Sequence, residues 1–225
     1  MKVFVVIPAF NEEQVIGRVI EEVKKIVNEV IVVDDGSKDQ TSILARQAGA
    51  RVVRHRLNRG QGAALQTGIL SALGLGAEVI VTFDADGQHL ASEINQIIKP
   101  IISGEAEVTL GSRFLLPSSL SNIPLSKKVI LKLATWLTEF YTGLSITDTH
   151  NGFRAFSRTA AKNIIIRQDG MAHASEIIEQ IKKHNLKFKE VAVTIKYTDY
   201  SKQKGQRLTN SFKIAWDLFF RRVIR

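Results

Sequence analysis

The sequence predicts a single α/β domain with a mostly parallel central sheet and helices on both of its faces. Strand-like and helix-like hydrophobic patterns alternate through the first half of the chain, which favours parallel strands joined by right-handed helical crossovers. The first apolar run, residues 2–7, is uninterrupted, as expected of a strand buried on both faces. With 225 residues, of which 44% are hydrophobic and 24% charged, the chain can also form one sizeable core.

The elements of the first half follow from these patterns in order. A helix is expected over 12–27 because its apolar residues recur at helical spacing. Ser37 is placed to cap the next helix, and Gln40 completes a capping-box-like pair with it. The expected strands are 2–7, 29–33, 51–54, 78–83 and 106–110, and the expected helices are 12–27, 38–48, 61–74 and 91–102.

The second half is less regular. It contains a long apolar helix candidate over 126–143, strands over 152–157 and 187–195, and a charged loop over 197–207. We find no internal repeat, low-complexity segment or linker. The expected organisation is therefore one domain over 1–207, followed by an amphipathic helix over 208–225 that packs on the domain or lies at a membrane surface.

Composition narrows the class of protein. The chain has no cysteine, which excludes disulfides and thiolate metal sites and fits a reducing, cytoplasmic compartment. Its apolar N-terminal run is too short for a signal peptide, and no run of about 20 apolar residues predicts a transmembrane helix. A formal net charge of +9 favours anionic partners. Nucleic acid is not expected to be one of them, because the charge is spread along the chain and no nucleic-acid-binding motif is present.

Two carboxylates, Asp84 and Asp86, follow the fourth expected strand and are succeeded by a glycine. Side chains at i and i+2 of a strand point to the same side, so the two carboxylates can converge. Two hard oxygen ligands at a strand end suit Mg²⁺ or Mn²⁺ with positions left for substrate phosphates. The alternative is a polar turn that ends the strand, because Asp and Gly are ordinary turn residues.

Other strand ends also carry polar groups, as expected where ligands bind at the carboxyl ends of strands. Asp34 and Asp35 follow the second strand and could accept hydrogen bonds from a base or ribose, although a turn with an N-cap at Gly36-Ser37 is the alternative. After the third strand, Gly60 and Gly62 open a helix. They predict either a phosphate-facing loop or a tight helix entry.

Together these segments resemble glycosyltransferase family 2, the inverting group with the GT-A fold. The matching segments are VVIPAFNEE (5–13), VVDDGS (32–37), NRGQGAAL (58–65) and FDADGQH (83–89). Two further segments, GSRF (111–114) and TDTHNGFRAF (147–156), are similar to the subgroup that contains dolichol-phosphate mannosyltransferase and polyprenyl-phosphate hexosyltransferases. The resemblance covers residues 1–157 well and is weaker beyond.

The resemblance implies roles for individual residues. Binding of the nucleotide-sugar is implied for Pro8, Phe10, Asn11, Glu12, Asp34, Asp35, Gly36, Ser37, Gly60, Gly62, Asp84, Ala85 and Asn151. Asp84, Asp86 and Gln88 would form the metal site, with Mg²⁺ or Mn²⁺ on the diphosphate. Asp86, Arg113, Asp148 and Arg154 would be catalytic, although Arg154 could instead form a structural ion pair with Asp148. Lys202, Lys204 and Arg207 match a late basic loop of the family only loosely; they would bind the nucleotide-sugar by closing over the nucleotide or would neutralise the acceptor phosphate, and a solvated loop is the alternative there.

The implied reaction is direct displacement at the anomeric carbon of a GDP- or UDP-sugar by a polyprenyl or dolichyl phosphate. The metal and Arg113 would stabilise charge on the departing diphosphate. The acceptor phosphate is already ionised, so no strong general base is required. No histidine is assigned as a base, and His173 is expected to orient Glu176.

A membrane surface is an expected partner. Residues 208–225 combine aromatic residues with Arg221, Arg222 and Arg225, which suits an interfacial helix at the cytoplasmic membrane face. Many members of the subgroup carry transmembrane helices that are missing here, so a homodimer or a separate membrane-embedded partner is also considered. The competing functions are transfer to a saccharide or other hydroxyl acceptor and a catalytically silent subunit that binds a membrane partner.

Overall fold

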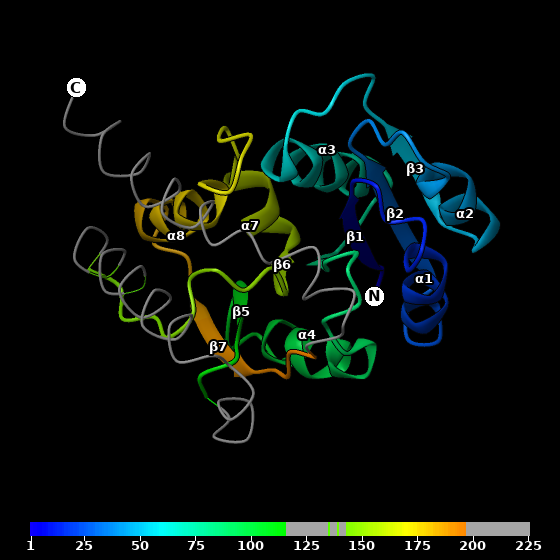
Figure 1. Cartoon of the computed structure of the whole chain (residues 1–225). Helices are drawn as coiled ribbons and strands as arrows, with labels where there is room; N and C mark the ends of the chain where they lie inside the picture. Colours follow the sequence, from blue (N-terminus) through cyan, green and yellow to red (C-terminus); the bar gives the residue numbers. More distant parts are fainter. Residues whose placement is uncertain (116–134, 136–138, 140–142, 197–225) are drawn as a thin grey trace, which may run out of the picture.

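The computed structural model describes residues 1–115, 135, 139 and 143–196. These residues form a seven-stranded sheet with the order β3-β2-β1-β4-β6-β5-β7 (Figure 1). Neighbouring strands are parallel except at β6, which runs antiparallel to β4 and β5. The expected mostly parallel sheet is confirmed. The strands are β1 (Val3–Ala9), β2 (Glu29–Asp34), β3 (Arg51–Arg54), β4 (Val79–Thr82), β5 (Val108–Ser112), β6 (Arg154–Ser157) and β7 (Phe188–Ala192).

Helices cover both faces of the sheet, as expected (Figure 1). Alternate residues of β1 point into two separate apolar layers. Phe4 and Val6 pack with residues of α3, α7 and α8, whereas Val5 and Ile7 pack with residues of α1, α2 and α4. The helices are α1 (Ile16–Lys24), α2 (Thr41–Gln47), α3 (Gln61–Gly74), α4 (Ile94–Ile102), α7 (Arg158–Asn163) and α8 (His173–Lys183), with a 3-10 turn at Ala91–Glu93.

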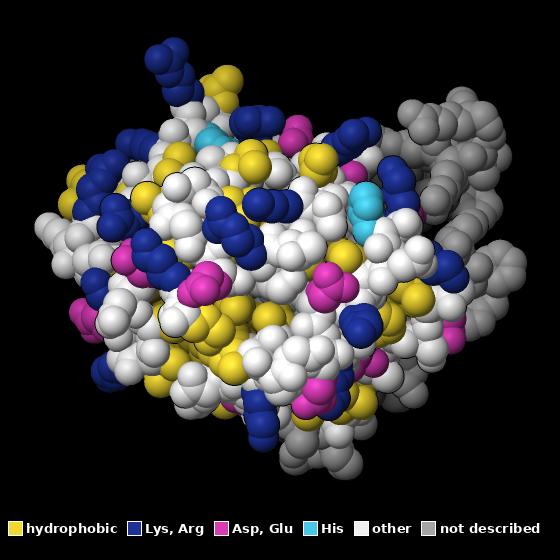
Figure 2. Space-filling view, turned by 180° about the vertical axis from the view of Figure 1, so that it is seen from behind, with side chains coloured by type: hydrophobic (Ala, Val, Ile, Leu, Met, Phe, Trp, Pro, Cys, Tyr) yellow, Lys and Arg dark blue, Asp and Glu magenta, His cyan; other side chains and the backbone are white. Residues whose placement is uncertain are grey.

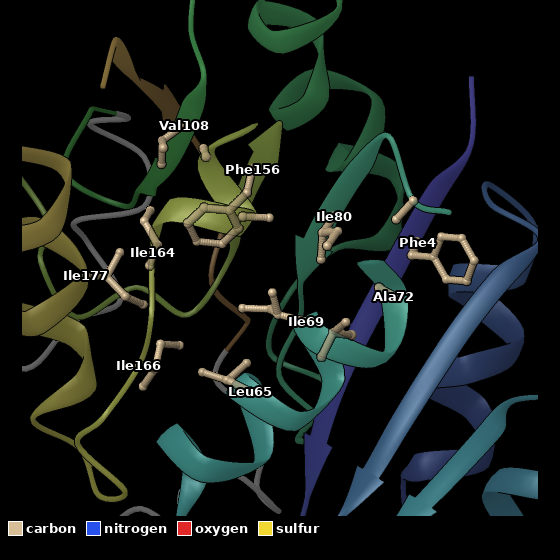
Figure 3. Close-up of a cluster of buried hydrophobic side chains, with 14 of the residues drawn as sticks. Phe4, Leu65, Ile69, Ala72, Ile80, Val108, Phe156, Ile164, Ile166 and Ile177 are labelled. Atoms are coloured by element: carbon tan, nitrogen blue, oxygen red, sulfur yellow. The ribbon is translucent and has the colours of Figure 1, made fainter. Parts of the chain in front are cut away.

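The first of these layers joins the two halves of the chain (Figure 3). Leu65 and Ile69 of α3 lie in the same buried cluster as Phe156 of β6 and Ile177 of α8. All four side chains are at most 4% exposed. Because this core spans from β1 to α8, residues more than 100 positions apart are held in fixed relative places.

The sheet brings the ends of β1, β2 and β4 to one edge. Ala9 pairs with Asp34 in the β1–β2 register, and Val6 pairs with Thr82 in the β1–β4 register. The pairing continues past the strand ends, where the Asp35 N–H donates to the Ala9 carbonyl at 2.8 Å. The segments after these three strands therefore meet, as the parallel topology predicts.

Several expected boundaries were wrong. The first helix begins at Ile16 instead of residue 12, because Asn11 adopts a left-handed φ of 53° and a turn precedes the helix. Helices α7 and α8 were not predicted. The α8 signal was present, since Ile177, Ile178 and Ile181 follow helical spacing and are buried. Most of the expected helix over 126–143 and the whole of 197–225 lie outside the described residues.

On the face shown in Figure 2, Lys and Arg side chains are spread over the surface with Asp and Glu among them. This distribution matches the spread of charge along the sequence. The absence of nucleic-acid binding stays a prediction. Within the part of the chain that the structure describes, no helix is long and apolar enough to cross a membrane.

Candidate active site

A cavity of about 420 Å³ opens at the edge where β1, β2 and β4 end. Half of the residues that line it are ones to which the resemblance gave a role in the site. These are Pro8, Phe10, Glu12, Asp35, Gly60, Asp84, Ala85, Asp86 and Arg154. The topology thus gathers predicted residues from β1, β2, β4, the start of α3 and β6 around one volume.

Other predicted residues do not line this cavity. They are Asn11, Asp34, Gly36, Ser37, Gly62, Gln88, Arg113, Asp148 and Asn151. Lys202, Lys204 and Arg207 lie outside the described residues. Of these residues, Gln88 and Asn151 contact side chains that do line the cavity, Asp86 and Arg154 respectively.

Asp84 is held by two neighbours. Its Oδ1 accepts a hydrogen bond from Gln61 Nε2 at 3.1 Å, and its Oδ2 accepts one from His89 Nε2 at 2.9 Å. His89 is buried against the rings of Phe83 and Phe153, with ring centroids 5.4 and 5.2 Å away. Burial opposes ionisation of Asp84, but the hydrogen bond and charge of His89 outweigh it and lower the pKa of Asp84. Asp84 is therefore an oriented carboxylate at neutral pH.

Asp86 has the opposite electrostatics. Its Oδ1 accepts the Gln88 N–H at 3.0 Å, while its Oδ2 has no hydrogen-bond partner among the described residues. Burial and then the negative charge of Asp84 raise the pKa of Asp86 to about 6. A bound cation would therefore stabilise the ionised form of Asp86.

These two carboxylates fit a metal ion whose remaining coordination positions are filled by a substrate. Among the described residues there is no cluster of three or more His, Cys, Asp or Glu side chains that could hold an ion alone. Mg²⁺ is commonly bound through one or two carboxylates together with substrate phosphates. Asp86 Oδ2 offers such a ligand at the cavity wall, and Gln88 contributes its backbone N–H to Asp86.

Asp34 is a structural residue of the β2 end. It is fully buried and accepts hydrogen bonds from the Ser37 N–H at 2.8 Å and from the Ser42 hydroxyl. Arg54 Nε lies 3.3 Å from its Oδ2. These contacts fix the turn after β2, which matches the turn expected as the alternative for this segment. The expected N-cap at Ser37 is wrong, because α2 begins at Thr41 after the N-cap residue Gln40, and no side-chain hydrogen bond caps it.

Gly60 and Gly62 allow close packing at the start of α3. The Gly62 N–H donates to the Asp169 carbonyl at 2.8 Å, and the Gly60 N–H donates to Asp35 Oδ2 at 2.7 Å. A Cβ at Gly62 would overlap the Gln168 carbonyl oxygen. These N–H groups are therefore committed to protein acceptors, which favours the tight-entry alternative over a phosphate-facing loop.

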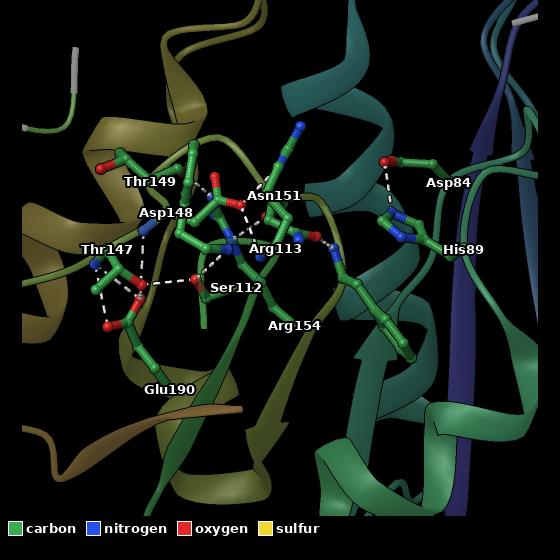
Figure 4. A network of polar contacts seen from close by, with 12 residues as sticks. Asp84, His89, Ser112, Arg113, Thr147, Asp148, Thr149, Asn151, Arg154 and Glu190 are labelled. Atoms are coloured by element: carbon green, nitrogen blue, oxygen red, sulfur yellow. Dashed lines mark hydrogen bonds and ion pairs between the residues drawn. The ribbon is translucent and has the colours of Figure 1, made fainter. Parts of the chain in front are cut away.

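A buried polar network lies beside the cavity (Figure 4). Arg113 Nε donates to Asp148 Oδ2 at 2.6 Å, and both side chains are less than 10% exposed. Glu190 of β7 accepts the N–H groups of Thr147 and Asp148, at distances of 2.9 to 3.3 Å, and the Thr147 hydroxyl at 2.8 Å. Burial raises the pKa of Glu190. The network fixes the 147–148 segment to β7.

Arg154 does not form the ion pair with Asp148 that was one of its two predicted roles. Its Nη2 donates to the Thr149 carbonyl at 2.7 Å and its Nε donates to the Asn151 carbonyl at 3.0 Å. Burial lowers the pKa of Arg154 to about 10, so the guanidinium is still charged at neutral pH. It places a positive charge in the cavity wall while it shapes the 149–151 backbone.

Two histidines of the cavity wall were not identified as site residues. Burial and then the charge of Arg154 lower the pKa of His173 to about 4, and burial lowers the pKa of His150. His173 Nδ1 faces the Gly170 carbonyl at 2.8 Å. The expected contact with Glu176 is wrong, because Glu176 instead accepts the backbone N–H groups of residues 167 and 168. His173 reaches the cavity through long-range packing of α8, which no local motif reveals.

Comparisons with known proteins agree with this geometry. The model of the family described as glycosyl transferase family 2 matches residues 4–165. An uncharacterised protein of Methanocaldococcus jannaschii is 41% identical, over 99% of this chain and 93% of its own length. A UDP-N-acetylglucosamine–dolichyl-phosphate N-acetylglucosaminyltransferase of Methanococcus voltae is 34% identical, over 96% and 94%. Polyprenol monophosphomannose synthase of Mycolicibacterium smegmatis is 31% identical, over 95% and 86%.

Solved structures share the fold. Glucosyl-3-phosphoglycerate synthase of Mycobacterium tuberculosis, crystallised with Mn²⁺ and UDP-glucose, has a TM-score of 0.75. The match covers 97% of this chain and 76% of that one. Because the two chains are only 21% identical, this match shows a shared fold and not a shared activity.

Proposed function

The chain belongs to glycosyl transferase family 2 and is a glycosyltransferase, and we propose that it moves a hexose from a nucleotide-sugar to a polyprenyl or dolichyl phosphate. One observation carries this proposal. The cavity is lined by the oriented carboxylate of Asp84, by Asp86, whose ionised form a bound cation would stabilise, and by Arg154, which carries a guanidinium. Two relatives, a dolichyl-phosphate N-acetylglucosaminyltransferase and a polyprenol monophosphomannose synthase, support the acceptor class.

The nucleoside would lie along the ends of β1 and β2. Phe10 is 39% exposed and offers a ring for stacking on a base. Pro8 and Glu12, its neighbours in sequence, also line the cavity. Asp35 and Asp84 offer carboxylates to base or ribose donors. Asp86 would hold Mg²⁺ or Mn²⁺ on the diphosphate, where the metal supplies stabilisation of the developing negative charge.

The arginines would act at the phosphates. Arg154 lies in the cavity wall and adds a fixed positive charge there. Arg113 is held by Asp148 beside the cavity, and we assign the acceptor phosphate to it together with Lys202, Lys204 and Arg207. No proton needs to be removed from a phosphate acceptor at neutral pH.

Transfer to a saccharide hydroxyl is the second candidate, and His173 favours it. His173 lines the cavity, and because its pKa is lowered to about 4 the ring is neutral at pH 7; it offers a proton acceptor beside the substrate, although so low a pKa makes it a weak base. A pH-rate profile of the replacement His173→Gln separates the two. If the acceptor is a phosphate, the pH-rate profile of His173→Gln keeps the shape of the wild-type profile. If the acceptor is a hydroxyl, the rate of His173→Gln falls at least about 100-fold below that of the wild type.

Transfer of labelled sugar from UDP- and GDP-sugars to a polyprenyl phosphate, with and without Mn²⁺, tests the main proposal. We expect metal-dependent product with the wild type and none with Asp86→Ala. Glu22→Ala, which removes an exposed carboxylate of α1, should leave the rate unchanged. Product formation by Asp86→Ala at the wild-type rate would contradict the metal role, and no product from any donor would favour a silent subunit.

We also propose that the protein acts at the cytoplasmic face of a membrane, as a homodimer or with a membrane-embedded partner. The composition of residues 208–225 supports a membrane surface as partner. Binding to anionic vesicles at low salt should weaken when Arg221 and Arg222 are both replaced by Glu. Equal binding by the double variant would contradict this surface.

A further inference from the structure

Asp35 is a carboxylate of the cavity that is held by three polar groups of the protein. It is 3% exposed and lines the cavity after β2. Its Oδ1 accepts the Arg59 N–H at 2.9 Å and faces His55 Nδ1 at 2.7 Å. Its Oδ2 accepts the Gly60 N–H at 2.7 Å. An ionised carboxylate offers about four acceptor positions, two on each oxygen. Within the described chain, Oδ1 is therefore filled and Oδ2 keeps one open position.

The contacts around Asp35 hold this arrangement in place. His55 Nδ1 faces a carboxylate and therefore carries the proton, while its Nε2 lies 3.0 Å from the Thr67 hydroxyl of α3. The 57–58 backbone also packs on Gly36, where a Cβ would lie 2.8 Å from the Asn58 nitrogen. The loop that fills Oδ1 is thus fastened both to α3 and to the end of β2.

We propose that this half-filled Asp35 makes the donor site selective for uridine over guanosine nucleotides. The inference rests on the proposed function, because it assigns the base of the donor. The pairing edge of uracil presents one N–H donor, at N3, which matches the single open position on Oδ2. The pairing edge of guanine presents adjacent donors at N1 and N2, which need both oxygens of a carboxylate. Guanine would place its second donor against the filled Oδ1.

His55 is the residue that closes Oδ1, so it acts as a specificity-determining residue through Asp35. Leaving a buried donor without an acceptor costs a factor of about ten or more in affinity. Cytosine has an acceptor at N3, which would face the carboxylate unfavourably. The expected order of affinity is therefore UDP, then GDP, with CDP no better than GDP.

Titration calorimetry of the full-length chain with UDP, GDP and CDP, each with Mn²⁺, tests the proposal. We expect UDP to bind at least about tenfold more tightly than GDP. Equal or tighter binding of GDP would overturn the selectivity and leave the proposed function intact. Binding of none of the three would instead contradict the proposed function, because no nucleotide site would exist.

Two matched variants at His55 separate selectivity from folding. His55→Asn keeps an N–H donor near the place of Nδ1, whereas His55→Leu removes it. We expect the ratio of UDP to GDP affinity to be retained in His55→Asn and to fall several-fold in His55→Leu. A merely structural role would weaken both nucleotides equally and leave the ratio unchanged in both variants, which would contradict the assignment of His55. If His55→Leu does not fold, the wild-type ratio alone decides whether the site is selective.

Discussion

Replacement of Asp86 by asparagine should stabilise the protein in the absence of metal while it abolishes metal binding. The pKa of Asp86 is raised to about 6 from an ordinary 3.8, so the folded protein disfavours the charged form. A pKa difference of about two corresponds to at most about 3 kcal/mol at about 1.36 kcal/mol per pKa unit. The amide oxygen of the introduced asparagine can still accept the Gln88 N–H, as the carboxylate of Asp86 does. The gain should therefore come from removal of the charge alone.

The pH dependence gives this prediction its sign. Because the folded pKa is raised, the penalty is absent below about pH 4, grows as pH rises, and is complete above about pH 6. Urea unfolding in EDTA should show a difference between Asp86→Asn and wild type of about 1 kcal/mol at pH 4.5 and up to about 3 kcal/mol at pH 7.5. Glu22→Gln removes an exposed carboxylate of the same charge and is the control. Equal stability of Asp86→Asn and wild type from pH 5 to 8 would refute the electrostatic assignment.

Three further replacements have defined outcomes. Gly152→Ala should reduce transfer at least about 100-fold, because its Cβ would lie 2.6 Å from Asp84 Oδ1 and displace that carboxylate; activity near the wild-type value would contradict the placement of Asp84. Asp148→Asn removes the buried ion-pair partner of Arg113 and should lower the free energy of unfolding by about 3–5 kcal/mol in urea titrations, whereas a change below about 1 kcal/mol would argue against a buried pair. Gly62→Ala should lower the thermal midpoint by several degrees because its Cβ meets the Gln168 backbone carbonyl, and an unchanged midpoint would contradict that contact.

Much of the sheet was predictable because its strands are short, apolar and separated by amphipathic helices. The strand-end residues followed from the same pattern, since a parallel sheet gathers them at one edge. Asp84 and Asp86 illustrate this, because their chemistry lies next to the strand in sequence. Their different electrostatics were not predictable, since Gln61 of α3 and His89, which folds back from five residues further along, bind both oxygens of Asp84.

Adjacent residues at the end of β2 mark another limit. Asp34 and Asp35 were treated alike, yet Asp34 lies in the core with Ser42 and Asp35 lines the cavity. Alternation along an extended chain sends neighbouring side chains to opposite sides, so this difference was available in principle. The approach of His173 was not, because it depends on how α8 packs after residue 170.

The antiparallel strand β6 has a consequence for how the chain folds during its synthesis. It inserts between β4 and β5, so Thr82 of β4 pairs with Arg154, about 70 residues later. At about 5–20 residues per second, a ribosome needs about 4–14 s to make that intervening stretch. During that interval the edge of β4 opposite β1, to which β6 later binds, has no strand to pair with, and an unpaired edge is a template for intermolecular association. We therefore expect this chain to need chaperones while it is being synthesised, whereas the completed fold, with β6 in place, does not depend on them.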